Sequence, residues 1–253
     1  MTTSVLRRLT AVVLVAGALA TAPPARAQGT GDGFLFRAPN GALVVRGGFD
    51  QALAGSDIFA QAMSDFTLRK HDFAGLSISG ELLATLSPRL DLVVGAGWAG
   101  SSTGSEYRTW VDNNYLPIQQ TTSFERVPLT GGLRYFLVPP GQAVGHLAWV
   151  PSRVAPFVAG GIGVVWYRFR QYGDFIDLAS PTLSVFADDL RTSDWALMAY
   201  LGAGVDISVT PRMFLTGEAR YTSSRGNLGP AYAGFSRIDL SGVAVTFGVG
   251  FRM

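Results

Sequence analysis

Apolar and polar positions alternate with a period of two along most of the chain, and the alternation is clearest at the C-terminal end. In the segment 244–253, Val245, Phe247, Val249 and Phe251 fall on one side of an extended strand, and small residues fall on the other. A water-soluble sheet usually packs its apolar face on a second layer and turns a polar face to water. The pattern therefore raises the question of what the bulky face contacts.

The same period recurs from residue 41 to the end, while no window longer than about twelve residues keeps a helical period. This pattern predicts an all-β fold with eight strands. The expected strands span 41–50, 73–86, 90–101, 122–138, 154–169, 194–209, 213–223 and 237–252.

Short and long connections alternate between these strands. The links after the second and sixth strands are the tight turns 87–89 and 210–213, and the long links are rich in Asp, Ser, Asn and Gly. An up-and-down barrel in an outer membrane has this asymmetry, with short periplasmic turns and longer external loops. The expected external loops are 50–72, 102–121, 170–193 and 223–236, and the first of them contains a possible short helix, DIFAQAM. The link 139–153 is an exception, because it is long but falls on the periplasmic side.

Each expected strand pairs an apolar face with a small or charged face. In strand 194–209, for example, Leu197, Leu201 and Val205 lie opposite Tyr200 and Asp206. The exterior of a soluble, lipocalin-type barrel should carry many Lys and Glu residues, but the chain has one lysine. A narrow eight-stranded barrel also needs small residues inside. The sequence thus predicts an eight-stranded antiparallel up-and-down transmembrane β-barrel with its apolar side toward lipid.

The first 27 residues have the pattern of a secretory signal peptide. Arg7 and Arg8 precede an apolar run of 12 residues, which is followed by an A-x-A sequence that ends at Ala27. The run is shorter than the ~20 residues that a membrane-spanning helix needs. The expected organisation is a cleaved signal peptide at 1–27, a lead-in segment at 28–40 and a barrel at 41–253.

Charge and cysteine content narrow the function classes. Cleavage of the signal removes three of the 20 basic residues against 18 acidic residues, so the net charge becomes slightly negative. Nucleic acid is therefore not implied as a partner. The chain has no cysteine, which excludes disulfides and thiolate metal sites.

Three segments together resemble a known family. The segments PFVAGGIGVVWYRF (156–169), PLTGGLRYFL (128–137) and GAGVDISVTPRMFLTGEARYTS (202–223) look like the small outer-membrane β-barrel family that includes OmpA-type, OmpX-type and OmpW-type proteins. The resemblance implies a monomer in the cell outer membrane that contacts lipid and lipopolysaccharide. It also implies periplasmic chaperones and the barrel-assembly machinery as partners during biogenesis.

Members of this family end in an aromatic residue that the assembly machinery reads. Here the aromatic is Phe251, third from the end, and the expected assembly signal is Phe247, Val249 and Phe251. No segment follows the barrel, so the peptidoglycan-binding domain of OmpA-type proteins is not expected.

With the apolar side turned outward, seven charged residues of the expected strands point into the lumen. They are Arg46, Glu81, Asp91, Arg134, Asp206, Glu218 and Arg220. A charge in a narrow lumen is costly unless it is paired and hydrogen-bonded. The near balance of signs predicts an internal ion-pair network that plugs the lumen and a structural or surface-interaction role. The alternative is a narrow channel for small or apolar solutes.

A lipid-modifying enzyme is the third hypothesis. It would require a nucleophile such as Ser with a His and an acid within reach. The chain has only His71, in the first external loop, and His146, in the long periplasmic link. Neither lies on a strand face beside an inward Ser and an acid, so we expect no catalytic, cofactor or metal site.

Overall fold

The computed structural model describes residues 33–112, 115–145, 148–177 and 184–253. The expected signal peptide lies outside these residues, and Gly33–Met253 form one unit. The barrel strands are β1 (Gly41–Ala52), β2 (Ala74–Ser87), β3 (Leu90–Val111), β4 (Pro117–Phe136), β7 (Val154–Asp177), β8 (Ser184–Ser208), β9 (Met213–Gly226) and β11 (Gly242–Arg252). The smaller elements are α2 (Asp57–Asp65), η1 (Lys70–Phe73), β5 (Gly141–Val144), β6 (Ala148–Pro151), η2 (Pro230–Tyr232) and β10 (Ile238–Asp239).

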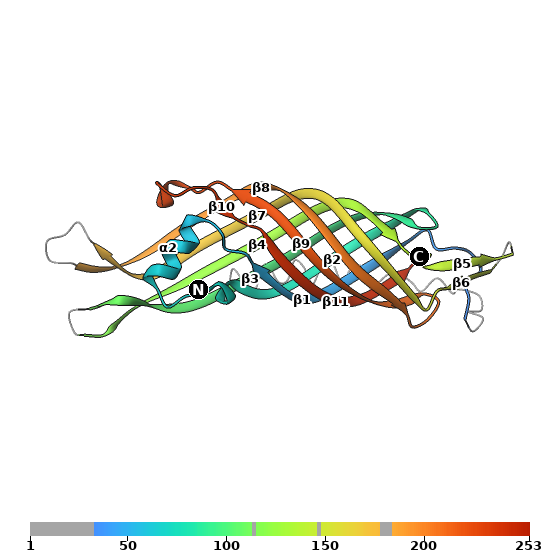
Figure 1. Cartoon of the computed structure of the whole chain (residues 1–253), viewed down its shortest axis with the longest axis horizontal. Helices are drawn as coiled ribbons and strands as arrows, with labels where there is room; N and C mark the ends of the chain where they lie inside the picture. Colours follow the sequence, from blue (N-terminus) through green and yellow to red (C-terminus); the bar gives the residue numbers. More distant parts are fainter. Residues whose placement is uncertain (1–32, 113–114, 146–147, 178–183) are drawn as a thin grey trace, which may run out of the picture. The chain divides into compact units, whose positions relative to one another are not determined.

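The eight barrel strands form a closed antiparallel ring (Figure 1). Neighbours in the chain pair with one another around the ring, β4 pairs with β7, and β11 pairs with both β9 and β1. Closure leaves no open edge along the length that all eight strands share, so every strand there has a partner on both sides. The expected eight-stranded antiparallel barrel is confirmed.

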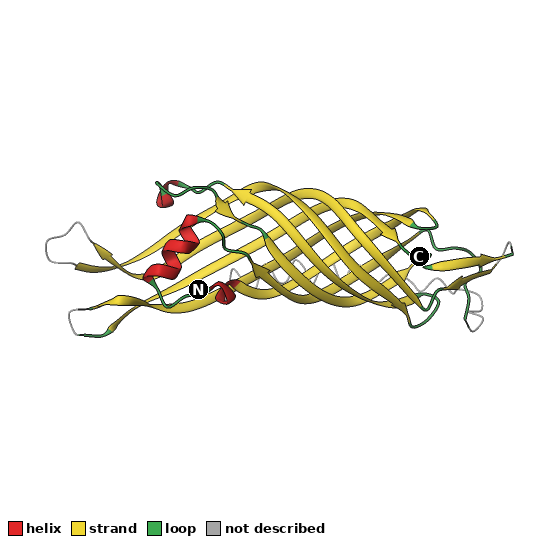
Figure 2. Ribbon diagram, viewed as in Figure 1, coloured by secondary structure: helices red, strands yellow, loops and turns green. Residues whose placement is uncertain are grey.

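The two ends of the barrel differ (Figure 2). One end, called here the helix end, carries α2, η1, η2 and the long hairpins β3–β4 and β7–β8. The other end, the turn end, carries the tight β2–β3 and β8–β9 turns. It also carries the β5–β6 hairpin, which is formed by the long link 139–153 that the sequence left without an expected structure. The short helix expected in DIFAQAM is α2.

Two of the expected external loops are largely strand, so those boundaries were wrong. In 102–121, β3 and β4 remain paired from Ser102 to Glu106. In 170–193, β7 and β8 remain paired as far as Asp177 and Ser184. The Ser, Thr, Gln and Asp residues of these segments suit loops. In the barrel, however, they continue the alternation of the strands below them, and their inner face packs under α2 and η2.

The outer face of the ring is apolar, and the inner face has small residues where large ones approach it. Leu197, Leu201 and Phe247 are exposed at 81%, 70% and 69%, and they lie on the outward face. On the inner face of β11, a Cβ atom on Gly250 would lie 2.1 Å from the ring of Phe214. A Cβ on Gly248 would lie 2.8 Å from Cγ of Arg46. The C-terminal alternation thus places bulky groups outside and leaves room inside for side chains from other strands.

The apolar outer face leads to a first test, the substitution Leu201→Arg. A charge on the lipid face near the membrane midplane destabilises a barrel by about 2–4 kcal/mol. We expect a loss of this size in the free energy of unfolding, measured by urea titration in phosphatidylcholine vesicles. The control is Ala60→Arg, which adds the same side chain to an exposed position of α2, where we expect a change within ~0.5 kcal/mol. Equal effects of the two variants would contradict a lipid-facing Leu201.

Candidate functional site

The centre of the lumen is occupied by arginines gathered around one carboxylate, that of Glu81. Arg46 Nη1 lies 2.6 Å from Glu81 Oε2, and Arg220 Nη2 lies 2.5 Å from Glu81 Oε1. Arg134 Nη2 donates a hydrogen bond of 3.2 Å to Glu81 Oε2. Arg46 and Glu81 are each 2% exposed. A single buried carboxylate therefore joins arginines of β1, β4 and β9.

A second carboxylate, that of Glu218, closes the network on the opposite wall. Its Oε1 accepts a hydrogen bond of 2.6 Å from Arg220 Nε, and its Oε2 lies 3.3 Å from Arg46 Nη2. Asp206 Oδ2 lies 3.6 Å from Arg134 Nη1. The guanidinium of Arg134 also stacks over the Phe157 ring, at 4.0 Å from its centroid. The network thus ties together β1, β2, β4, β8 and β9 across the lumen.

Six of the seven lumen charges expected from the sequence meet in this network, and Asp91 does not. Asp91 is buried and lies opposite Arg134 in the β3–β4 register. No ion pair that includes Asp91 occurs among the described residues. Asp91 lies toward the turn end, where it lines a smaller cavity with Arg134 and Asp206.

A second ion pair, Asp50–Arg126, lies nearer the helix end and was missed by the sequence analysis. Arg126 Nη2 donates to Asp50 Oδ1, and Arg126 Nη1 donates to the carbonyl of Leu240 at 2.9 Å. Arg126 falls on the same strand face as Arg134, so the alternation could have identified it. Asp50 stood at the boundary of an expected loop, and the alternation gave no reason to pair it.

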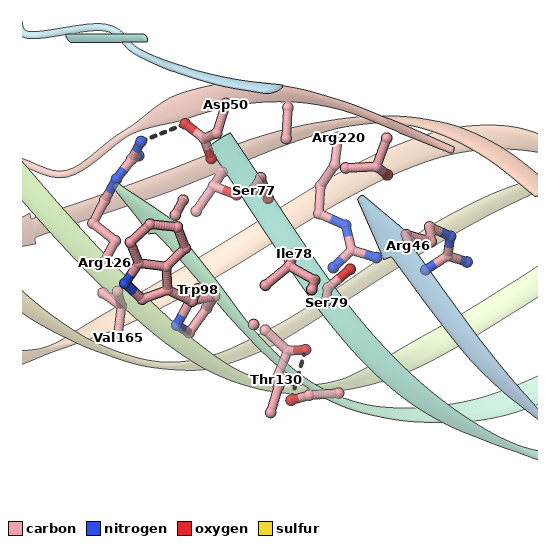
Figure 3. A pocket seen from close by; sticks show the side chains of 18 of the residues that line it. Arg46, Asp50, Ser77, Ile78, Ser79, Trp98, Arg126, Thr130, Val165 and Arg220 are labelled. Atoms are coloured by element: carbon pink, nitrogen blue, oxygen red, sulfur yellow. Dashed lines mark hydrogen bonds and ion pairs between the residues drawn. The ribbon is translucent and has the colours of Figure 1, made fainter. Parts of the chain in front are cut away.

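A cavity of about 70 Å³ lies between the ion network around Glu81 and the Asp50–Arg126 pair. Figure 3 shows Asp50 joined to Arg126 at one side of this cavity, and Arg220 and Arg46 at the other. Part of the lining consists of hydroxyl groups, from Ser77, Ser79, Thr130, Thr222 and Thr246. Apolar side chains such as Trp98 and Val165 form most of the rest, so the cavity has a mixed lining with charged groups at its two sides.

Aromatic residues close the helix end above this cavity. Phe59 of α2 is fully buried, and its ring centroid lies 4.9 Å from that of Phe73 and 5.4 Å from those of Phe124 and Phe169. Tyr232 of η2 packs against Phe169 at 5.6 Å. This aromatic cover consists of Phe59, Phe73, Phe124, Phe169 and Tyr232.

The helix that carries Phe59 is held to the last loop by polar contacts. Ser236 donates from its backbone N–H to Asp57 Oδ2 and from its hydroxyl to Asp57 Oδ1, both at 2.8 Å. Asp239 accepts a hydrogen bond of 3.0 Å from the Gly55 N–H, and its own N–H donates to Ser56 Oγ. The Ser236 backbone N–H holds the pKa of the Asp57 carboxyl below its ordinary value.

The turn end has its own seal, which comes from the long link 139–153. Trp149 of β6 is 6% exposed, and its backbone pairs with Leu35 of the lead-in segment through hydrogen bonds of 2.8 and 2.7 Å. The guanidinium of Arg252 stacks over Phe214 at 4.7 Å and over Trp149 at 5.4 Å. The link therefore places a tryptophan beneath the lumen.

The remaining sequence candidates lie away from the lumen. Phe247, Val249 and Phe251 lie on the outward face of β11, and their role as an assembly signal stays a prediction. His71 is an exposed residue of η1 whose Nε2 lies 3.3 Å from Asp72 Oδ1. His146 lies outside the described residues. In the described part of the chain, no group of three or more His, Cys, Asp or Glu residues could hold a metal ion.

A closed ring of eight strands with an apolar outer face and a packed, charged interior defines a transmembrane β-barrel of the outer-membrane type. None of the helices in the described ranges is long and apolar enough to cross a membrane.

Neither a family model nor a curated protein matches the chain. The structure is similar to Neisserial surface protein A (NspA), with a TM-score of 0.45 and 14% identity over 84% of this chain and 99% of that one. It is similar to OprG from Pseudomonas aeruginosa, with a TM-score of 0.42 and 14% identity over 87% and 99%. It is also similar to Ail of Yersinia pestis, with a TM-score of 0.38 and 12% identity over 85% and 99%.

The ion network leads to a second test, the substitution Arg134→Ala. Removing one partner of a buried ion pair leaves an uncompensated charge and costs about 3–5 kcal/mol. We expect a loss of this size in the free energy of unfolding in vesicles. The control is Arg153→Ala, because Arg153 is exposed at the turn end and should change stability by less than ~0.5 kcal/mol. An unchanged unfolding midpoint for Arg134→Ala would contradict a stabilising buried ion network that includes Arg134.

The Asp57–Ser236 contact leads to a third test, based on pH. Because the folded pKa of Asp57 is lowered, its contribution is present above the unfolded pKa of about 4 and is lost as the pH falls through the folded pKa. We expect the amides of α2 to lose protection below pH ~4 in hydrogen exchange corrected for the intrinsic rate. In Asp57→Ala, protection should be low at neutral pH and should lack this acid transition. An identical acid transition in wild type and variant would assign the effect to another group.

Proposed function

We propose that this protein is a structural or surface-interaction component of the outer membrane, with a lumen that is closed to solutes. The observation that carries the proposal is the buried network around Glu81, which joins β1, β4 and β9 across the centre of the barrel. A solute crossing the lumen would have to break ion pairs whose partners are 1–2% exposed, with Arg220 at 19%. Breaking such pairs leaves buried charges without compensation, which is costly.

The charge balance of the lumen supports the same proposal. The inward cations are Arg46, Arg126, Arg134, Arg220 and Arg252, and the inward anions are Asp50, Glu81, Asp91, Asp206 and Glu218. An ion-selective pore usually presents an excess of one sign to the permeating ion. A balanced interior offers no such excess and suits a packed plug.

The position in the cell follows from the asymmetry of the barrel. Short turns of outer-membrane barrels are periplasmic and long connections are external, so we assign the turn end to the periplasm and the helix end to the cell surface. In this proposal residues 1–27 are removed on export. Periplasmic chaperones and the barrel-assembly machinery insert the chain as a monomer, among lipid and lipopolysaccharide. The extended β3–β4 and β7–β8 hairpins then form the surface available to other molecules.

The alternative role, a narrow channel for small or apolar solutes, is favoured by one feature of the wall. The β3–β4 register runs from Leu90 to Ala96 and resumes at Ala99. The interval faces Pro128, which has no N–H to donate to a neighbouring strand. The cavity of about 70 Å³ touches this interval, because Gly97, Trp98 and Pro128 line it. This irregular part of the wall therefore borders the cavity, while the ion network lies between the cavity and the turn end.

The lipid-modifying enzyme is supported by no contact among the described residues. His71 has Asp72 as its ion-pair partner and is exposed on η1. In the part of the chain that is described, the His71 side chain makes no hydrogen bond to a serine, so the arrangement of nucleophile, base and acid that such chemistry requires is not assembled there.

Conductance across a planar bilayer tests the proposed function. We expect the refolded mature chain, residues 28–253, to give no discrete current steps. Phe59→Ala should stay silent as well, because it opens the aromatic cover but leaves the ion network. Resistance of the unheated protein to SDS unfolding provides the folding control in both cases. Reproducible current steps from the folded wild type would overturn the closed lumen and favour the channel.

A further inference from the structure

On the outer surface of β7 and β8, apolar residues are followed by arginines toward the helix end. Trp166 of β7 and Trp195 of β8 lie directly opposite one another in the register. Toward the helix end, the next outward positions are Arg168 and Arg170 on β7, and Arg191 lies opposite Arg170 on β8. These three arginines are called here the arginine face.

The arginine face lies at the height of lipid headgroups. Interfacial tryptophans mark the boundary of the hydrocarbon core. From Trp166 to Arg170 the strand advances by about 13 Å, which corresponds to about 9 Å of height for a tilt of about 45°. The headgroup layer extends about 5–8 Å beyond each face of the core. Arg168 therefore lies within this layer, and Arg170 and Arg191 lie at its outer edge.

The arginine face has more cations than the neighbouring carboxylates can balance, because Arg170 and Arg191 both act on Asp189. Arg170 donates to both carboxylate oxygens of Asp189, at 2.6 and 2.7 Å. Arg168 Nη1 lies 3.7 Å from Glu125 Oε2, and its guanidinium stacks over Trp166 at 5.0 Å. Arg191 is exposed, and it takes part in no ion pair with another described residue. Three guanidinium groups thus face two carboxylates.

The register also places two of these arginines directly opposite one another. Directly opposed side chains on one face of an antiparallel pair lie close together, and like charges in such positions destabilise the sheet. Arg170 and Arg191 are opposed in this way. The adjoining part of the wall lacks the feature, because Ser123 of β4 and Ser102 of β3 continue the row beyond Arg170. The row of arginines therefore does not continue onto β4 and β3.

We propose that the arginine face binds a phosphate group of an outer-leaflet glycolipid. The planar guanidinium presents paired donors that match phosphate oxygens. Because the arginine face lies beside Trp166 and Trp195, its ligand is expected to be a molecule whose acyl chains lie against the apolar outer face of the barrel. This proposal rests on the proposed function in one respect, the assignment of the helix end to the cell surface.

The test measures binding of lipid A by native mass spectrometry of the refolded mature chain in detergent. The two probes are lipid A that carries both phosphates and the same lipid with its phosphates removed. Wild type should retain the phosphorylated form preferentially. Arg191→Gln should weaken that retention about tenfold, because a hydrogen bond to a charged group contributes roughly this factor. Arg191 has no ion-pair partner to lose, so this variant should keep the fold.

The matched control is Arg237→Gln, which removes one exposed arginine of the last loop at the same end of the barrel. It should retain phosphorylated lipid A as wild type does. Equal retention of the two lipids by wild type, or equal retention by Arg191→Gln and wild type, would overturn the proposal. Displacement of the lipid by an equal concentration of inorganic phosphate would overturn the assignment to a lipid. These outcomes concern lipid binding and not conductance. A conducting channel would contradict the proposed function, whereas absent lipid binding would contradict only the arginine face as a lipid site.

Discussion

The interior of the barrel is arranged around one buried carboxylate, that of Glu81. A carboxylate removed from water requires compensation from several directions, and in an antiparallel ring those directions belong to different strands. Arg46, Arg134 and Arg220 supply it from β1, β4 and β9. The interaction therefore connects β1, β4 and β9, which do not pair with one another in the sheet.

The inner face of the wall leaves space for the side chains of this network. Glycines on the inner face, such as Gly248 and Gly250, give room to Arg46 and to Phe214. With the polar groups held inside, the outer face is left to apolar residues that meet lipid. Both ends of the barrel are closed by aromatic side chains. Phe59 of α2 and Trp149 of β6 each enter the lumen from a connecting segment, so the charged centre lies between two aromatic seals.

Much of this architecture could be predicted from the sequence, because a period of two assigns each residue of a strand to one face. The eight strands and the inward direction of Glu81 and Arg134 follow from that rule alone. The individual ion pairs do not, because partners such as Arg220 and Glu81 lie on strands that are not neighbours. The hairpins beyond residues 102 and 170 were assigned to loops from their polar composition. The aromatic seal of the turn end was not predicted, because Trp149 lies in a link without clear periodicity.

A double-mutant cycle at Arg46 and Glu81 measures whether the two buried charges stabilise the barrel through their contact. The free energy of unfolding in vesicles would be measured for wild type, Arg46→Gln, Glu81→Gln and the double variant. Contacting charges in one network have coupling energies of about 0.5–3 kcal/mol. We expect a favourable coupling in the upper part of that range, because the pair is buried and its nearest atoms lie 2.6 Å apart. A coupling indistinguishable from zero would contradict it, since the two groups would then contribute independently and the lumen would not be held closed by their interaction.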